Sequence, residues 1–226
     1  MTPLVSFAER RVIIMKISGA IFDMDGTLLD SAEMWRGAAS RYITSLRKTP
    51  ESDLGDKTKA MTLPELCRYL KETYRIATTE EKIAKGFNTI IREDYLASVD
   101  IKEYVPIILE KFKQKGIQMC VATSTDKEIA DEILARLGIR DYFFHIVTCE
   151  ESGGGKADPE VFENAHKLLG TPKEETVVFE DGILAISGAK EAGFYVIAVA
   201  DESEKENKEE IKALADRYIE SFEELL

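Results

Sequence analysis

Cysteine and histidine are scarce in this chain of 226 residues, which has three of the first and two of the second. Cys67, Cys120 and Cys149 show no metal-like spacing, and their odd number argues against a disulfide framework. His145 and His166 stand far apart and near no recognisable motif, so we interpret both as structural or surface residues. The sequence therefore indicates neither a cysteine metal site nor a disulfide-stapled scaffold.

Positive charge is also in short supply, because 30 Lys and Arg face 42 Asp and Glu and leave a net charge of -12. This balance argues against a nucleic-acid surface, which normally needs a basic face. It also opposes the approach of a phosphorylated substrate, unless a bound divalent cation and a local lysine compensate. Hydrophobic content of 44% and charged content of 32% are typical of a globular protein.

Long apolar runs are missing, so we expect no membrane span. In residues 1–14 the arginines follow the apolar part, which is the wrong order for a secretory signal. Met15 directly precedes the first expected strand and is a candidate natural start. We therefore expect a cytoplasmic enzyme with no membrane partner and no nucleic-acid partner.

The pattern of expected secondary structure divides the chain into regions. An apolar strand at 17–22 is followed by residues that read as helices only, and then by alternating strands and helices. Such alternation predicts a parallel sheet with helices on both faces. We first expect helices at 31–46, 62–74, 79–98 and 99–115. Strands are then expected at 117–123, 143–148, 176–179 and 194–200. The helices between and after them are expected at 126–137, at 159–169, from the end of the strand at 176–179 to about 192, and at 204–215.

The distance between the first two strands indicates an inserted domain. Asp25 and Thr123 are 98 residues apart, whereas a strand–helix–strand crossover needs only about 30. We assign residues 1–30 and 103–226 to an α/β core and residues 31–102 to an all-helical insertion.

Two aspartates follow the first strand. Asp23 and Asp25 are two residues apart, so that both face the same side if the strand direction persists. Gly26 then lets the backbone turn away. One carboxylate can attack phosphorus as a nucleophile, and the other can handle the proton of the leaving group. The plain alternative is an Asp-rich turn.

Polar residues also follow later strands, where a parallel sheet places its ligands. Thr123 and Ser124 end the second strand, and Lys156 follows three glycines after the third. Glu180 and Asp181 come directly after another apolar strand and offer the hard oxygen ligands that suit Mg²⁺. Taken singly, each has a plain alternative. Thr123 and Ser124 are typical of a helix cap, Lys156 of a solvated lysine, and the Glu180–Asp181 pair of a charged surface.

Taken together and in this order, the four segments resemble the motifs of the haloacid dehalogenase-like phosphatase superfamily. The resemblance covers about residues 16–226 and implies a Rossmann-like doubly wound parallel sheet. The helical insertion resembles the C1 cap of the β-phosphoglucomutase and phosphoglycolate phosphatase branch. The segments are DMDGT at 23–27, VATS at 121–124, GGGKADP at 153–159 and VVFEDG at 177–182.

The resemblance implies a role for each acidic residue. Asp23 is expected to be the nucleophile and a Mg²⁺ ligand. Asp25 is expected to act as general acid and then as base, with its backbone carbonyl on the metal. Asp181 is expected to complete the metal site, with Glu180 bound directly or through water.

The other motif residues are expected to hold phosphate. Thr123, assisted by Ser124, would bind the transferring phosphoryl group, and Lys156 would neutralise its charge and that of Asp23. We also expect phosphate or substrate contacts from Gly26 and Thr27.

Two departures from the mutase branch favour hydrolysis. Trp35 stands where the mutases have a histidine, and residues 59–63 (KAMTL) lack their phosphate-gripping arginine. Asp25 argues for phosphorus chemistry over dehalogenation. We predict a Mg²⁺-dependent phosphatase of a small phosphorylated metabolite, acting as a monomer or small homo-oligomer, with Trp35, Arg36 or residues near Met61 in contact with the substrate. The alternatives are a hexose-phosphate mutase, a phosphonate-cleaving enzyme and a non-catalytic binding protein.

Overall fold

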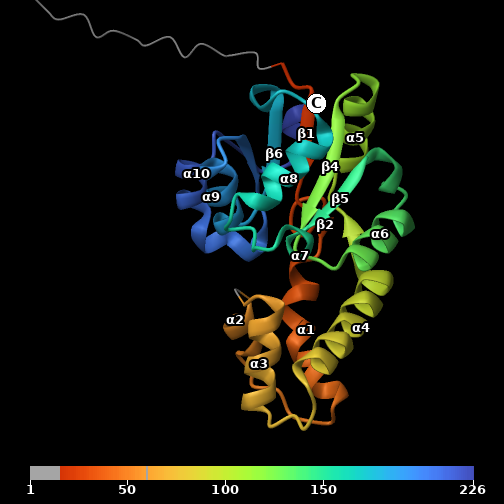
Figure 1. The fold of residues 1–226 in the computed structure, drawn as a ribbon, viewed down its shortest axis with the longest axis vertical. Helices are drawn as coiled ribbons and strands as arrows, with labels where there is room; N and C mark the ends of the chain where they lie inside the picture. Colours follow the sequence, from red (N-terminus) through yellow and green to blue (C-terminus); the bar gives the residue numbers. More distant parts are fainter. Residues whose placement is uncertain (1–15, 60) are drawn as a thin grey trace, which may run out of the picture.

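A computed structural model describes residues 16–59 and 61–226 (Figure 1). The expectations for residues 1–14 and for Met15 as a natural start lie outside the described residues.

The centre of the fold is a parallel sheet of six strands in the order β5-β4-β1-β6-β7-β8. From β1 the chain builds outward through β4 and β5, and then continues on the other side of β1 with β6, β7 and β8. This doubly wound order confirms the predicted fold class; the short strand β8 was not predicted. The strands are β1 (Gly19–Phe22), β4 (Gln118–Thr123), β5 (His145–Thr148), β6 (Thr176–Glu180), β7 (Tyr195–Val199) and β8 (Arg217–Ile219).

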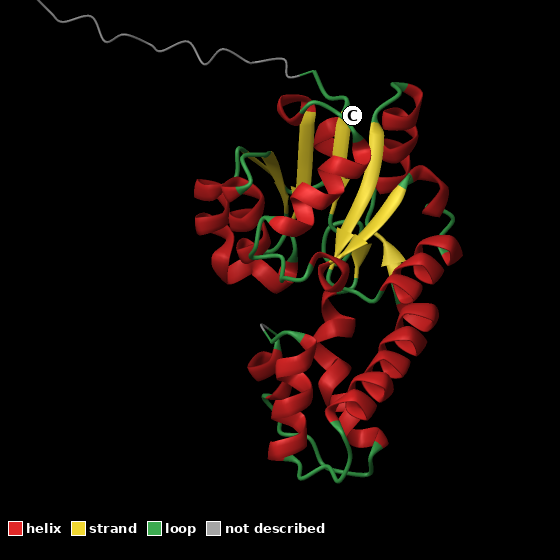
Figure 2. Ribbon diagram, viewed as in Figure 1, coloured by secondary structure: helices red, strands yellow, loops and turns green. Residues whose placement is uncertain are grey.

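Helices cover both faces of the sheet, as Figure 2 shows. Side chains alternate along β1, so Phe22 packs on one face and Ile21 on the other. The Phe22 ring stacks on Phe179 of the neighbouring strand with centroids 4.6 Å apart. The first face carries α5 (Val105–Gln114) and α6 (Lys127–Arg136); the second carries α8 (Glu160–Leu169), α9 (Ile183–Glu191) and α10 (Lys208–Leu214).

Four helices form a separate group beyond the carboxyl ends of the strands (Figure 1). They are joined to the sheet by a small antiparallel pair, β2 (Leu29–Asp30) and β3 (Asp100–Ile101). Three of the helices were predicted, and the short α2 was not. We call this group the helical segment; its definition as a domain at 31–102 stays a prediction. Its members are α1 (Ala32–Ser45), α2 (Leu54–Thr58), α3 (Leu63–Thr73) and α4 (Glu80–Ser98).

The single helix predicted at 99–115 is wrong. Val99 is extended, β3 follows, and the helix begins only at Val105. Pro106 lies in the first helical turn, where a missing N–H costs nothing, and Tyr104 before it has a left-handed φ of 65°. The backbone N–H of Lys102 instead donates to Leu28, which continues the link between β2 and β3.

The helix predicted at 204–215 is also divided. Residues Glu202–Asn207 form a 3₁₀-helix, and the α-helix α10 starts at Lys208. Asp201 accepts a hydrogen bond from the backbone N–H of Ser203 and so begins the tighter turn. In the part of the chain that the structure covers, no helix combines the length and apolar character that crossing a membrane requires.

Candidate active site

The first motif leaves the sheet in a tight loop. The backbone N–H of Asp23 donates to Phe179 at 2.9 Å, which extends the β1–β6 pairing by one residue. Gly26 then adopts φ +83°, and a Cβ there would lie 2.3 Å from Oδ2 of Asp181. Glycine is required at this position both by the backbone conformation and by the approach of the carboxylate.

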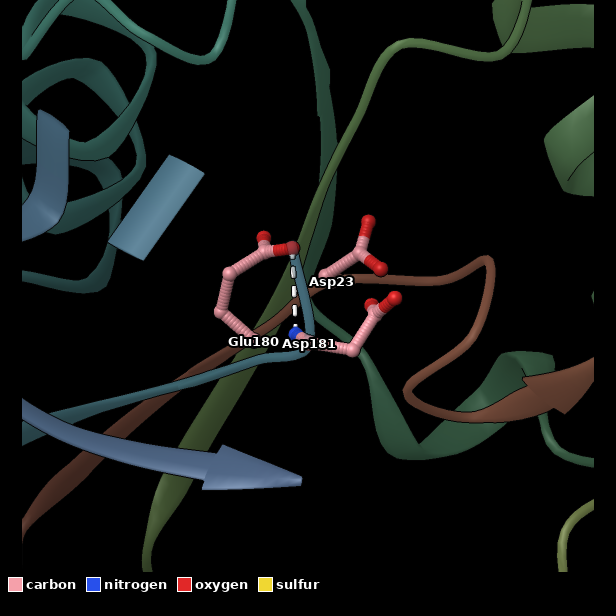
Figure 3. Close-up of side chains that lie close together, drawn as sticks. All are labelled: Asp23, Glu180 and Asp181. Carbon is pink, nitrogen blue, oxygen red and sulfur yellow. Dashed lines mark hydrogen bonds between the residues drawn. The ribbon is translucent and has the colours of Figure 1, made fainter. Parts of the chain in front are cut away.

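Three carboxylates meet at the carboxyl ends of β1 and β6. Asp23, Glu180 and Asp181 each offer a ligand oxygen within 4.8 Å of the others, and all three are buried. Figure 3 shows the side chains converging, with Asp23 and Asp181 next to each other. We call these three residues the acidic cluster.

Lys156 supplies a positive charge to the acidic cluster. Its ammonium donates to Oδ1 of Asp23 and, at 2.9 Å, to Oε2 of Glu180. The loop that carries it is held by the carboxylate of Asp158, which accepts from the backbone N–H of Gly155 at 3.0 Å. The structure thus brings together the lysine and the acidic residues that the sequence placed in three different motifs.

The single positive charge of Lys156 does not neutralise the three carboxylates of the acidic cluster. Burial raises the pKa of Asp23 in spite of Lys156, and burial with the Asp23 charge raises the pKa of Glu180 to about 7. Burial raises the pKa of Asp181 well above its usual range. Burial by itself would lower the pKa of Lys156, but the Asp23 and Glu180 carboxylates raise it. Three hard oxygen donors with excess negative charge fit a divalent cation.

Hydrogen bonds orient the members of the acidic cluster. The hydroxyl of Thr27, fully buried, donates to Oδ1 of Asp181 at 2.9 Å. Oε1 of Glu180 accepts from the backbone N–H groups of Asp181 and Gly182 at 3.2 and 3.1 Å. In this structure Thr27 therefore positions a carboxylate; its predicted contact with phosphate or substrate stays a prediction.

Asp25 lies outside the acidic cluster. Among the described residues its carboxylate accepts from three hydroxyls: Ser31 at 2.8 Å and Tyr95 at 2.5 Å on Oδ1, and Thr125 at 2.8 Å on Oδ2. We call these three residues the hydroxyl cluster. Strand β1 ends at Phe22, before either aspartate, and the two carboxylates have different hydrogen-bond partners. That both aspartates face one substrate atom stays a prediction.

The hydroxyl cluster comes from three elements, and none of its members was predicted as a site residue. Ser31 begins the helix predicted at 31–46, but within the described residues its hydroxyl caps no backbone N–H and donates to Asp25 instead. Thr125 directly follows the predicted Thr123 and Ser124, a signal that a third hydroxyl was present. Tyr95, on α4, carried no local signal.

The remaining predicted residues lie around the same edge of the sheet. Thr123 is fully buried and its hydroxyl accepts from the backbone N–H of Thr125 at 3.0 Å. Ser124 is exposed, with its Oγ 3.3 Å from Sγ of Cys149. The indole N–H of Trp35 donates to the hydroxyl of Tyr95 at 3.2 Å. The contacts of these three predicted residues with phosphate or substrate stay predictions.

Comparison with known proteins gives relatives along most of the chain. A phosphorylated carbohydrates phosphatase of Thermotoga maritima is 30% identical over 177 residues, which cover 78% of this chain and 82% of that protein. The β-phosphoglucomutase of Bacillus subtilis is 26% identical, covering 81% of this chain and 83% of that protein. A fructose-1-phosphate phosphatase of Escherichia coli is 26% identical, covering 81% and 97%.

The fold has a close match among solved structures. CbbY of Rhodobacter sphaeroides, solved in complex with phosphate, superposes with a TM-score of 0.82 at 23% identity, covering 92% of this chain and 96% of that one. The model of the haloacid dehalogenase-like hydrolase family matches residues 20–199. The chain belongs to the haloacid dehalogenase-like hydrolase family.

Proposed function

We propose that this chain is a Mg²⁺-dependent phosphatase that hydrolyses a small phosphomonoester through an aspartyl-phosphate on Asp23. The observation that carries the proposal is the division between the two aspartates of one motif. Asp23 lies in the acidic cluster beside Lys156, whereas Asp25 lies among hydroxyls. The first arrangement suits a nucleophile in a cation site, and the second suits a group that exchanges protons.

The reaction has two steps in this proposal. A carboxylate oxygen of Asp23 attacks phosphorus, the bond to the leaving oxygen breaks, and Asp25 gives its proton to that oxygen. Water then attacks the phosphorus of the aspartyl-phosphate, Asp25 takes the proton of the water, and inorganic phosphate and Asp23 are released. Lys156 compensates charge on Asp23 and on the phosphoryl oxygens in both steps, which is the main requirement of phosphoryl transfer.

The acidic cluster would hold the divalent cation. The family resemblance implies the backbone carbonyl of Asp25 as a further ligand. When bound, the cation supplies positive charge that holds the phosphoryl oxygens and lowers the repulsion between them and the carboxylates. The chain's own residues prepare this place, because Thr27 and the backbone N–H of Gly182 fix the carboxylates of Asp181 and Glu180. The identity of the cation as Mg²⁺ rests on the all-oxygen donor set.

The proposed substrate is a sugar phosphate or a similar metabolite. The names of the Thermotoga maritima and Escherichia coli relatives, both phosphatases of phosphorylated carbohydrates, support this class. We propose that the protein acts in the cytoplasm on this metabolite as a monomer or small homo-oligomer, with no nucleic-acid partner.

A hexose-phosphate mutase is the alternative, supported by the Bacillus subtilis relative. Trp35 stands where that branch has a histidine, and its indole N–H is directed to Tyr95. An indole exchanges no proton at neutral pH, so it cannot replace the histidine. This contact favours hydrolysis over transfer between two positions of a sugar.

Phosphate release from a panel of sugar phosphates, nucleotides and small acid phosphates tests the proposal. We expect release with Mg²⁺, none with chelator, and none from Asp23→Asn. Asp131→Asn is the matched control, because Asp131 is an exposed aspartate on α6 that pairs with Arg140 and does not belong to the acidic cluster. Isomerised sugar phosphate in place of free phosphate would favour the mutase. Unchanged substrates throughout would contradict both enzymes and favour a binding protein.

A further inference from the structure

The carboxylate of Asp25 lies on a loop and accepts hydrogen bonds from the hydroxyl cluster. Three hydroxyl donors reach it, and the shortest contact is the 2.5 Å hydrogen bond from Tyr95. Tyr95 lies 70 residues away in the chain and belongs to the helical segment rather than to the sheet. A residue of the helical segment therefore contacts the expected proton donor directly.

The hydroxyl of Tyr95 is itself oriented. The indole N–H of Trp35 donates to the phenolic oxygen at 3.2 Å, and the indole packs edge-on against the phenol ring with centroids 6.3 Å apart. The phenolic oxygen also lies 3.2 Å from Oγ1 of Thr125. Each hydroxyl has one hydrogen, and both have a closer acceptor in Asp25: Thr125 donates to Oδ2 at 2.8 Å and Tyr95 to Oδ1 at 2.5 Å. The phenol is fully buried, so no water competes for this donor.

The backbone that carries Tyr95 is anchored to the core. The guanidinium of Arg136 on α6 donates to the carbonyl of Tyr95 at 3.0 Å and to that of Val99. Arg92, one turn before Tyr95, pairs with Glu132 of α6 at 2.5 and 2.8 Å. The backbone at Tyr95 thus has a position set by α6, independent of Asp25.

Oδ1 and Oδ2 of Asp25 are unequally used. Among the described residues, Oδ1 accepts from Ser31 and Tyr95, whereas Oδ2 accepts from Thr125 alone. A carboxylate oxygen has two lone pairs, so the free capacity is on Oδ2. The arrangement presents Oδ2 as the atom that exchanges a proton.

We propose that Tyr95 is a positioning residue for Asp25: its hydroxyl, oriented by Trp35, fixes the carboxylate so that Oδ2 delivers and receives the proton. This inference rests on the proposed phosphatase function. In this proposal the helical segment orients the group that transfers the proton, in addition to any contact that it makes with the substrate.

The test compares two leaving groups of similar shape and different basicity. Phenyl phosphate expels a basic phenolate that needs a proton, whereas p-nitrophenyl phosphate expels a weakly basic one that does not. Release of each phenol is measured in a single turnover with enzyme in excess and Mg²⁺ present, which isolates the first step. The proteins are wild type, Tyr95→Phe and the matched control Tyr42→Phe, which removes a hydroxyl from another buried tyrosine of the helical segment.

We expect Tyr95→Phe to slow release from phenyl phosphate about 10-fold, because general acid catalysis contributes about 100-fold or more when the acid is well placed. Release from p-nitrophenyl phosphate should stay within about 2-fold of wild type, which also shows that the variant is folded. Tyr42→Phe should change neither rate by more than about 2-fold, as is usual for a substitution away from the site. Equal slowing of both substrates by Tyr95→Phe, no slowing, or faster release from phenyl phosphate would each overturn the positioning role.

Thr125, whose hydroxyl lies 3.2 Å from that of Tyr95, offers a second version of the test. Thr125→Val removes the hydrogen bond to Oδ2 with little change of shape, and Thr125→Ser retains the hydroxyl. We expect the same leaving-group dependence in the first variant and its rescue in the second. If wild type released neither phenol in this assay nor phosphate from the substrate panel, the proposed function would fail and the positioning role with it. If wild type releases both and the leaving-group dependence is unaltered in the variants, only the positioning role fails.

Discussion

Asp23 and Asp25 are two residues apart in the chain, yet their surroundings have little in common. Asp23 belongs to the acidic cluster, where buried charges oppose one another and one lysine compensates part of them. Asp25 has the hydroxyl cluster around it, where the neighbours are neutral and each donates a hydrogen bond. The acidic cluster is built by the sheet, and the hydroxyl cluster by the junction between the sheet and the helical segment.

The difference separates the two tasks that the proposed reaction needs. A region with excess negative charge attracts a cation and, through it, an anionic substrate. A region of neutral donors fixes a carboxylate by hydrogen bonds without an ion pair, so the carboxylate can change protonation state during the reaction. Substitutions in the hydroxyl cluster should therefore leave the Mg²⁺ requirement unchanged, and substitutions in the acidic cluster should leave the dependence on the leaving group unchanged.

Removing Lys156 should have the largest effect. Lys156→Ala leaves the carboxylates of Asp23 and Glu180 facing each other without the ammonium. We expect metal-free protein to lose about 3 kcal/mol of unfolding free energy. Turnover with Mg²⁺ should fall about 100- to 1000-fold, as it does when a charge-stabilising donor is lost. Urea unfolding in chelator and steady-state kinetics measure the two effects.

Lys127→Ala is the control for that substitution, because Lys127 pairs with Glu151 on the surface. An exposed pair contributes about 0–1 kcal/mol, and its loss should not change turnover. Similar losses in both lysine variants would contradict the central place of Lys156 in the acidic cluster.

Gly26→Ala should follow in size. The added Cβ would meet Asp181 in a backbone conformation with φ +83°, which costs about 2 kcal/mol of strain. Displacement of Asp181 should lower turnover about 100-fold, because small misplacements of reacting groups are costly. Gly116→Ala is the control, since Gly116 has φ +71° and no described atom lies within 4 Å of the point that a Cβ would occupy. Gly116→Ala should lose unfolding free energy through backbone strain and keep the turnover of wild type.

Glu180 should make the stability of metal-free protein fall as pH rises. Burial and Asp23 raise its folded-state pKa from 4.5 to about 7. Folded protein then binds more protons than unfolded protein between pH 4.5 and 7, so this contribution is present below pH 4.5 and lost as pH approaches 7. Its size is about 2 kcal/mol, given about 1.4 kcal/mol per pKa unit and a shift shared with Asp23.

The measurement is urea unfolding of wild type and Glu180→Gln from pH 4.5 to 7.5 without metal. The unfolding free energy of wild type relative to the variant should decrease over this range. Glu151→Gln is the control, because hydrogen bonding by Lys127 lowers the pKa of Glu151 below 4.5. The contribution of Glu151 is then lost only below pH 4.5, and this variant should run parallel to wild type over the measured range. A wild-type curve parallel to that of Glu180→Gln would contradict the crowding of charge in the acidic cluster.

The smallest effects should distinguish the two regions most directly. Thr27→Val removes the hydroxyl that orients Asp181, and Ser31→Ala removes one that holds Asp25. We expect Thr27→Val to raise the Mg²⁺ concentration for half-maximal activity about 10-fold, the usual consequence of losing an outer partner of a ligand. Ser31→Ala should leave that concentration unchanged and instead slow release from phenyl phosphate. Identical responses of the two variants would erase the distinction between the regions.

The acidic cluster was predictable because each member follows an apolar strand. Asp23, Glu180 and Asp181 stand at strand ends, and a parallel sheet brings such ends to one edge. Lys156 was predictable through its place after the strand β5 and its glycines. The predicted sheet, its helices on both faces and the helical content of residues 31–98 were also read from periodicity and spacing.

The errors fell where local preference and tertiary pairing compete. Asp100 and Ile101 were assigned to a helix, but they pair with Asp30 and Leu29 and join the two parts of the molecule. Ser31 has the residue type of a helix cap, yet its hydroxyl has a better acceptor in a charged carboxylate. In both places the partner lies in another segment, which periodicity does not detect.

By itself, the sequence determined the sheet, the acidic cluster and its lysine, since these depend on strand order and on residues next to strand ends. The tertiary structure alone decided which hydroxyls surround Asp25 and where the indole of Trp35 points. Tyr95 reaches Asp25 only because α4 returns from the helical segment to pack on α6. A contact across 70 residues depends on how two helices dock, and docking is set by packing that no local pattern encodes.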